Sequence, residues 1–200
     1  MIAAPFKVVL DANVLFPFSL RDTLLRAAAE GFFQLYWSDE ILDETIRNLI
    51  ATGTTTEAQA ARLRDKMTDA FPESMVTGYE PFIETMRNHR KDRHVAAAAL
   101  KVGAQVIVTC NLRDFRTLPE GLEALSPDDF LSDLLDLNPD RMFELVCEQA
   151  KALRRPPRSV GELLAGLAKM TPEFAQGLAK FGGVSLSSPS SAQTSGAAPR

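Results

Sequence analysis

The sequence contains few of the residues on which several common catalytic chemistries depend. It has two cysteines, Cys110 and Cys147, and two histidines, His89 and His94. The cysteines are far apart and have no histidine at metal-ligand spacing, which argues against a zinc site. Both histidines lie in one basic stretch, so no nucleophilic triad of serine or cysteine with histidine is indicated. We expect free thiols in a reducing compartment.

Long apolar runs and targeting segments are also missing. No stretch approaches the length of a membrane span. The apolar run near the N-terminus is short and is interrupted by Asp11, which is unlike a signal peptide. A glycine-rich phosphate-binding loop is absent as well. We therefore expect a cytoplasmic protein that does not contact a membrane.

The sequence also has no excess of basic over acidic residues. The formal net charge is −4 and the isoelectric point is near 5.3. Proteins that coat nucleic acid without specificity are usually basic, so this balance argues against that class. It does not exclude an enzyme with acidic metal ligands and a local basic rim. Basic residues do cluster in two runs, which taken alone fit solvated helix ends: Arg87, Arg90, Lys91 and Arg93, and Lys151, Arg154, Arg155 and Arg158.

Short apolar strands alternate with helices over the first part of the chain. Strands are predicted at Lys7–Leu10, Phe33–Trp37, Met75–Val76 and Val106–Thr109. Helices are predicted between them, including one from Ser38, a short one over Pro81–Asn88 and one that begins at Asp92 and ends at Gly103. This alternation is typical of an α/β sandwich around a parallel sheet.

The pattern changes after Ser126, where only helical periodicity remains. The predicted helices are 127–135, 139–153, 159–168 and 171–180, with a break at Pro156-Pro157. A chain of 200 residues has room for one domain and an appendage. We therefore expect an α/β domain over 1–130, a small helical C-terminal extension over 131–184 and a disordered tail over 185–200, which is rich in serine and small residues.

Acidic residues follow predicted strands or begin predicted helices. Asp11 and Asp114 follow the strands at Lys7–Leu10 and Val106–Thr109, Asp92 begins a helix, and Glu44 lies one turn into another. Ligands of open parallel sheets bind beyond the carboxyl ends of the strands, so these acids can meet at one edge. Clustered carboxylates repel one another unless a cation lies between them, and Mg²⁺ is a cation that prefers oxygen ligands.

Four segments resemble, in order, the signature segments of the PIN domain. They are VVLDANVL (Val8–Leu15), SDEILDETIRNL (Ser38–Leu49), KDRHVAAAAL (Lys91–Leu100) and VIVTCNLRDF (Val106–Phe115). The resemblance extends from Lys7 to about Phe130. It implies a three-layer α/β/α sandwich with a central parallel sheet, and a metal-dependent endoribonuclease that uses Mg²⁺ or Mn²⁺.

The resemblance also implies which residues form the site. The acids at the matching positions, both catalytic and metal-binding, are Asp11, Glu44, Asp92 and Asp114. The polar residues around them are Asn13, Thr109 and Asn111. Some members have the fourth acid at the position of Asn111, so the fourth ligand is either Asn111 or Asp114. Asp43 is a neighbouring alternative to Glu44, and one or two metal ions are both compatible with the pattern.

Compact bacterial PIN proteins include the VapC toxins of toxin–antitoxin pairs, which this chain resembles. That implies cleavage of tRNA or rRNA, inhibition of translation, a small antitoxin partner and a homodimer. The helical extension is longer than in the simplest toxins. Two other hypotheses stay open: a PIN nuclease of RNA processing or decay without an antitoxin, and a catalytically inactive module that binds RNA or protein. A haloacid-dehalogenase phosphatase is disfavoured, because it needs a second aspartate at Asn13.

RNA recognition by an acidic protein needs a local basic rim, because the phosphate backbone is otherwise repelled. The basic residues that flank the acids in the sequence are suited to this role. They are Arg87, Arg90, Arg93, Arg113 and Arg116.

Overall fold

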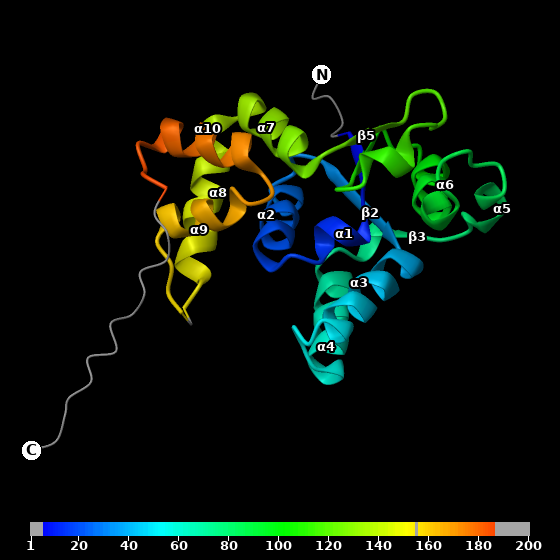
Figure 1. The fold of residues 1–200 in the computed structure, drawn as a ribbon, viewed down its shortest axis with the longest axis horizontal. Helices are drawn as coiled ribbons and strands as arrows, with labels where there is room; N and C mark the ends of the chain where they lie inside the picture. Colours follow the sequence, from blue (N-terminus) through cyan, green and yellow to red (C-terminus); the bar gives the residue numbers. More distant parts are fainter. Residues whose placement is uncertain (1–5, 155, 187–200) are drawn as a thin grey trace, which may run out of the picture.

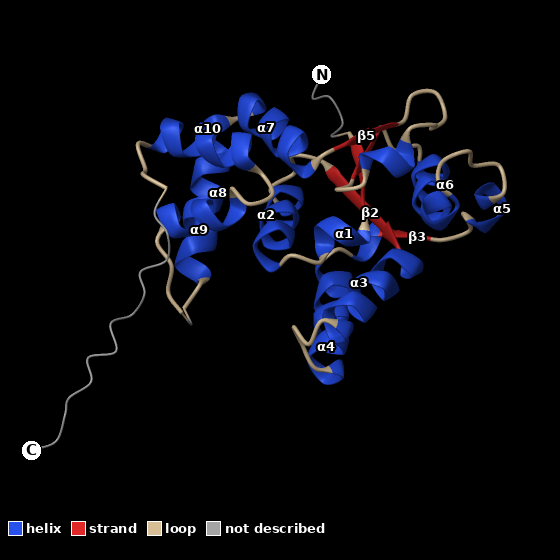
Figure 2. Ribbon diagram, in the orientation of Figure 1, coloured by secondary structure: helices blue, strands red, loops and turns tan. Residues whose placement is uncertain are grey.

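A computed structural model describes residues 6–154 and 156–186 of the chain. At its centre lies a five-stranded sheet in the order β3-β2-β1-β4-β5, in which every neighbouring pair is parallel (Figure 2). The strands are β1 (Lys7–Leu10), β2 (Gln34–Ser38), β3 (Met75–Val76), β4 (Val106–Val108) and β5 (Glu123–Leu125). The predicted parallel sheet is thus confirmed.

The two central strands are buried on both faces. Val8 and Val9 of β1 and Ile107 and Val108 of β4 have no exposed surface. Branched apolar side chains on successive positions suit a strand that is covered from both sides, as parallel sheets usually are. The sheet core therefore holds the carboxyl ends of β1 and β4 in fixed register, with Leu10 opposite Val108.

Helices cover the sheet on both faces, which gives the predicted α/β/α sandwich. Helix α6 (Arg93–Val102) packs on β1, β2 and β4. Helices α1 (Ala12–Leu15), α2 (Phe18–Ala29) and α3 (Asp39–Ala51) lie on the other side of the sheet (Figure 1). The remaining elements of this region are α4 (Glu57–Ala70), α5 (Glu80–Ile83) and three 3-10 turns: η1 (Pro72–Ser74), η2 (Arg90–Asp92) and η3 (Leu112–Phe115). None of the described helices combines the length and the apolar character that crossing a bilayer requires.

The structure differs from the sequence-based expectation in three elements. The fifth strand, Glu123–Leu125, was not predicted, because it lacks β-branched residues and begins with an exposed glutamate at the sheet edge. A one-turn helix, α1, follows Asp11 directly. The short helix expected over Pro81–Asn88 ends at Ile83, and the backbone N–H of His89 instead donates to the carbonyl of Asp114 (2.9 Å).

The C-terminal region contains four helices that pack on one another (Figure 1). They are α7 (Pro127–Leu137), α8 (Pro139–Ala152), α9 (Val160–Leu167) and α10 (Pro172–Gly182). Buried Gln149 of α8 accepts a hydrogen bond from Thr23 of α2 (2.8 Å) and donates one to the carbonyl of Ser19 (3.0 Å). These bonds attach the helical region to α2.

The domain limits suggested by the sequence stay predictions. A division after residue 130 falls inside α7, which begins at Pro127. Of the predicted tail over 185–200, only Ser185 and Leu186 belong to the described residues.

Candidate active site

Asp11 and Thr109 lie side by side at the carboxyl edge of the sheet. They directly follow the paired strands β1 and β4, and the backbone N–H of Asp11 continues the pairing by donating to the carbonyl of Val108 (3.1 Å). Parallel strands end at the same edge, so polar residues that follow them are brought together. This is the edge at which the sequence predicted a site.

Hydrogen bonds fix the Asp11 carboxylate in one orientation. Asp11 is the N-cap of α1, and its Oδ1 accepts from the backbone N–H of Ala12 (2.7 Å). Its Oδ2 accepts from Thr109 Oγ1 (2.7 Å) and from Asn13 Nδ2 (2.6 Å). Asn13 is held in turn, since its Oδ1 accepts from the backbone N–H of Cys110 (2.9 Å). Of the three polar residues predicted around the acids, Asn13 and Thr109 therefore contact Asp11 directly.

The charge on Asp11 is disfavoured in the folded protein. Only 3% of the residue is exposed, and this burial raises the pKa of its carboxyl to about 6. Hydrogen bonds from Thr109 and Ala12 oppose the shift, whereas the negative charges of Asp92 and Glu44 add to it. Both carboxylates are thus close enough to Asp11 to interact with it.

Asp92 and Asp114 form the second half of the acidic cluster, together with His89. One ligand atom of each of these three side chains lies within 4.8 Å of the others. Asp92 is 5% exposed and precedes α6, and its backbone carbonyl accepts from Asn88 Nδ2 (3.0 Å). Burial, followed by the charge of Asp114, raises the pKa of Asp92, while His89 and Lys91 act in the opposite direction.

One oxygen of Asp92 lacks a hydrogen bond. Its Oδ2 is buried and accepts none from any described residue, although His89 Nδ1 lies 3.4 Å away. A buried carboxylate oxygen without a partner is costly unless a cation compensates for it. The donor set fits a divalent cation: carboxylates are the oxygen ligands that Mg²⁺ and Mn²⁺ prefer, and an imidazole suits transition metals.

Glu44 approaches the cluster from α3, and its neighbour Asp43 does not. The Glu44 carboxylate lies 3.8 Å from Lys91 Nζ and 4.0 Å from His94 Nε2. Asp43 is exposed and forms an ion pair with Arg64 of α4. Helical periodicity alone left this choice open, and the observed geometry favours Glu44.

The observed geometry likewise favours Asp114 over Asn111 as the fourth ligand. The Asp114 carboxylate belongs to the group with Asp92 and His89. Asn111 is exposed, and its backbone N–H, not its side chain, contacts Thr109 Oγ1 (3.0 Å). The 3-10 turn η3 explains the difference, because it returns the chain to the cluster by the third residue after Asn111.

His89 is the residue at the cluster that the sequence-based prediction missed. It was considered only as a member of a basic stretch and as a triad candidate. The available signal was its position three residues before Asp92, which places both side chains on one side of a tight turn such as η2.

The predicted basic rim is largely exposed. Arg87, Arg90, Arg113 and Arg116 are exposed, whereas Arg93 is partly buried and donates to the carbonyl of Asn88 (3.4 Å). Among the described residues, none of these arginines forms an ion pair with an acidic side chain. Their charges are therefore available to a polyanion.

Comparisons with known proteins agree with the fold. Residues 7–113 match the family described as PIN domain, and residues 127–180 match the family described as VapC50 C-terminal domain. A curated protein of Mycobacterium tuberculosis (strain ATCC 25618 / H37Rv), named "Putative ribonuclease VapC50", is 43% identical over 101 residues. That match covers 49% of this chain and 60% of the relative. No solved structure was found to match significantly. More than half of the chain matches the PIN-domain model, so the protein belongs to the PIN-domain family, and its C-terminal helices resemble the VapC50 C-terminal domain.

Proposed function

We propose that this protein is a divalent-metal-dependent endoribonuclease and acts as the toxin of a toxin–antitoxin pair. The observation that carries the proposal is the partly buried acidic cluster, above all Asp92 Oδ2, which accepts no hydrogen bond from a described residue by distance and angle and has His89 Nδ1 3.4 Å away. The likeness to a relative named as a ribonuclease supports the choice of RNA as substrate. The proposed targets are tRNA or rRNA, so cleavage would inhibit translation in the cytoplasm. A small antitoxin and a second copy of the chain are the proposed partners.

In this proposal Asp11, Glu44, Asp92 and Asp114 hold one or two Mg²⁺ or Mn²⁺ ions. When bound, such an ion lowers the pKa of a water ligand and stabilises charge on the phosphate. The protein's own residues orient the ligands: Thr109 and Asn13 hold the Asp11 carboxylate in one rotamer, and Asn88 holds the backbone at Asp92. Arg87, Arg90, Arg93, Arg113 and Arg116 are the proposed contacts of the RNA backbone.

The test is cleavage of labelled RNA by the purified full chain with Mg²⁺, with Mn²⁺ and with a chelator. We expect cleavage only with a metal. Asp92→Asn and Asp114→Asn should lower the rate at least about a hundredfold, because each removes an oxygen charge that stabilises the transition state. Asn111→Ala serves as the matched control and should retain most activity.

The variants also test the proposed fourth ligand. Equal losses in Asp114→Asn and Asn111→Ala would contradict the assignment of Asp114. Metal-independent cleavage would overturn the proposed chemistry. RNA binding without cleavage under any metal would point to an inactive binding module.

A second experiment addresses the toxin role. Expression of the chain should stop growth and degrade tRNA or rRNA, and co-expression of the neighbouring open reading frame should restore growth. Asp11→Asn is the control for toxicity caused by expression alone. Nuclease activity without growth arrest would instead indicate an enzyme of RNA processing or decay.

A further inference from the structure

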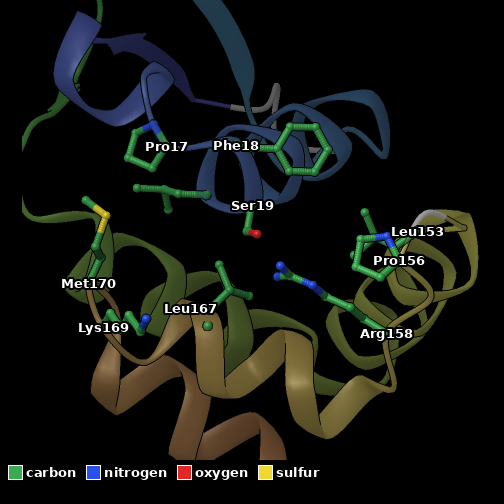
Figure 3. A pocket seen from close by; sticks show the side chains of 11 residues that line it. Pro17, Phe18, Ser19, Leu153, Pro156, Arg158, Leu167, Lys169 and Met170 are labelled. Carbon is green, nitrogen blue, oxygen red and sulfur yellow. The ribbon is translucent and has the colours of Figure 1, made fainter. Parts of the chain in front are cut away.

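A groove separates the start of α2 from the C-terminal helices, away from the acidic cluster. Its volume is about 530 Å³. One wall is formed by Pro17, Phe18 and Ser19, and the other by the segment after α8 and by the end of α9 with the residues after it (Figure 3). None of the four candidate metal ligands lines the groove. It is therefore a feature separate from the proposed nuclease site.

The groove walls are mainly apolar, and one of them carries an exposed aromatic ring. Phe18 is 57% exposed, which is unusual for so large an apolar side chain. The other apolar residues of the walls are Pro17, Leu20, Leu153, Pro156, Leu167 and Met170. Exposed apolar surface that is continuous and concave is a frequent sign of a binding site.

The wall that carries Phe18 is held rigidly. Arg21 of α2 is buried, and its Nη1 donates to the carbonyls of Leu15 (2.6 Å) and Phe16 (3.2 Å). Its guanidinium also lies 5.7 Å from the centre of the Phe18 ring. These contacts brace the turn between α1 and α2, which carries Phe18. A preformed wall lowers the conformational entropy that the protein loses when a ligand binds.

Two cations border this apolar surface. The Arg158 side chain extends into the groove towards Ser19, and Lys169 lies at the opposite end (Figure 3). Neither forms an ion pair with a described residue, whereas Arg26, Arg64 and Arg141 all do. In a protein with a net charge of −4, these two cations, which form no ion pair within the described part of the chain, make the border of the groove locally positive.

We infer that this groove binds a partner protein through a short segment with a bulky apolar side chain flanked by carboxylates. The apolar side chain would fill the space beside Phe18, and the carboxylates would pair with Arg158 and Lys169. Opposite charges across an interface steer association and exclude wrong partners. The inference goes beyond the proposed ribonuclease activity and does not depend on it, because no catalytic residue lines the groove.

The groove chemistry favours a peptide over RNA. Single-stranded nucleic acid binds to surfaces on which aromatic rings stack against successive bases. Phe18 is the one aromatic residue among those that line this groove, and the rest of the apolar wall is aliphatic or proline. Residues 187–200 of the chain itself do not have the required chemistry either, since they contain no acidic residue and no large apolar side chain.

The test measures binding of a fluorescent peptide of about twelve residues in which leucine and glutamate alternate. The full chain is measured in buffer that contains a metal chelator, so that bound metal cannot contribute to peptide binding. The variant Arg158→Glu/Lys169→Glu should bind at least about tenfold more weakly, since two attractive charges become repulsive. The control Arg62→Glu/Lys66→Glu makes the same charge change on exposed residues of α4 that form no ion pair with a described residue, and it should bind like the wild type.

A second variant tests the apolar part of the groove without changing charge. Gly166 of α9 lines the groove, and a Cβ atom added there would meet only Arg158 Nη1, at 3.9 Å. Gly166→Leu should fold, because leucine favours a helix more than glycine does. It should weaken binding at least about tenfold by filling the space of the peptide's leucine.

Four results would overturn the inference. One is equal binding of the peptide by wild type and both groove variants. Another is undiminished binding of a peptide with lysine in place of glutamate. The third is an oligouridine RNA that displaces the peptide and loses affinity in the same variants, which would identify the groove as an RNA site. A groove occupied by a second copy of the chain would appear as a dimer that dissociates in Gly166→Leu, and this too would replace the peptide assignment.

Discussion

Thr109 Oγ1 donates a hydrogen bond of 2.7 Å to Asp11 Oδ2, although the two residues lie 98 positions apart in the chain. Thr109 has no exposed surface, and its Oγ1 also accepts from Asn13 Nδ2 and from the backbone N–H of Asn111, each at 3.0 Å. A single hydroxyl thus joins the ends of two neighbouring strands to the turn that leads to Asp114. This hydroxyl therefore helps to orient the proposed ligand Asp11.

Two substitutions of Thr109 distinguish the role of its hydroxyl from the role of its side-chain shape. Thr109→Val keeps the volume but leaves two donors and the Asp11 carboxylate without their partner. We expect the free energy of unfolding to fall by about 1–3 kcal/mol. RNA cleavage should fall at least tenfold. Thr109→Ser keeps the hydroxyl, loses one methyl group and should retain most activity. Urea unfolding and metal-dependent cleavage measure both effects, and equal loss of activity in the two variants would argue against the hydrogen bond.

The raised pKa of Asp11 predicts how stability changes with pH in the absence of metal. The folded carboxyl has a pKa of about 6 and the unfolded one about 3.8, so the folded state binds the proton more tightly. The contribution of Asp11 to the free energy of unfolding is therefore greatest below pH 3.8, and it is lost as the pH rises towards 6. From the size of the shift, the contribution of this group is at most about 3 kcal/mol.

Asp11→Asn cannot titrate at this position, so a comparison of its stability with that of the wild type isolates the effect of Asp11. Between pH 4 and pH 7 in chelator, wild-type stability should decline relative to the variant as the pH rises. Other groups that titrate in this range largely cancel in the difference. Chemical unfolding of both proteins at several pH values gives the measurement. A difference that stays constant across the range would mean that Asp11 titrates normally.

The sequence predicts the centre of this fold better than its edges. Strands β1 and β4 were found because they are short runs of branched apolar residues that are buried on both faces. Strand β5 was missed because an edge strand needs fewer such residues, and Glu123–Leu125 has none that is β-branched. The hydrogen bonds that define it come from β4 and are invisible to a local pattern.

The site shows the same division between local and distant information. The placing of Asp11 after a strand is local, and so it could be predicted. The choice between Asp43 and Glu44 as the candidate ligand depends on Arg64, which lies on another helix, α4, and forms an ion pair with Asp43. His89 was missed because its contact with Asp92 requires a tight turn that propensity does not indicate. Ambiguities of this kind are resolved only by tertiary contacts.

Metal binding should distinguish the two neighbouring acids of α3. A divalent ion that binds only the folded state raises the melting temperature by mass action. Millimolar Mn²⁺ or Mg²⁺ should therefore stabilise the wild type. Glu44→Gln should reduce this effect, because Glu44 interacts with Asp11 across the cluster. Asp43→Asn is the matched control, loses only an exposed ion pair and should respond to metal like the wild type.

Thermal melts with and without each ion decide the matter. A wild-type melting temperature that does not change with either ion would count against a metal site. A loss of response in Asp43→Asn but not in Glu44→Gln would reverse the assignment.

The arginines around the cluster should control RNA affinity through the salt dependence of binding. Each phosphate that a cation neutralises releases counterions, and for single strands this contributes a slope of about −0.7 to the logarithmic salt plot. Changing Arg87, Arg90 and Arg113 together to glutamine should therefore weaken binding at low salt and flatten the slope by up to about 2. Both wild type and triple variant would carry Asp11→Asn, so that the RNA stays intact during the measurement.

A matched triple variant separates a local rim from the effect of overall charge. Arg62, Lys66 and Lys180 are exposed and lie on α4 and α10, and among the described residues none of them forms an ion pair. Changing them to glutamine alters the net charge equally and should leave the slope almost unchanged, because long-range effects are screened within about 10 Å at 0.1 M salt. Parallel salt plots for all three proteins would show that the RNA backbone contacts a different surface. Equal flattening in both triple variants would show that net charge, and not the arginines beside Asp92 and Asp114, determines RNA affinity.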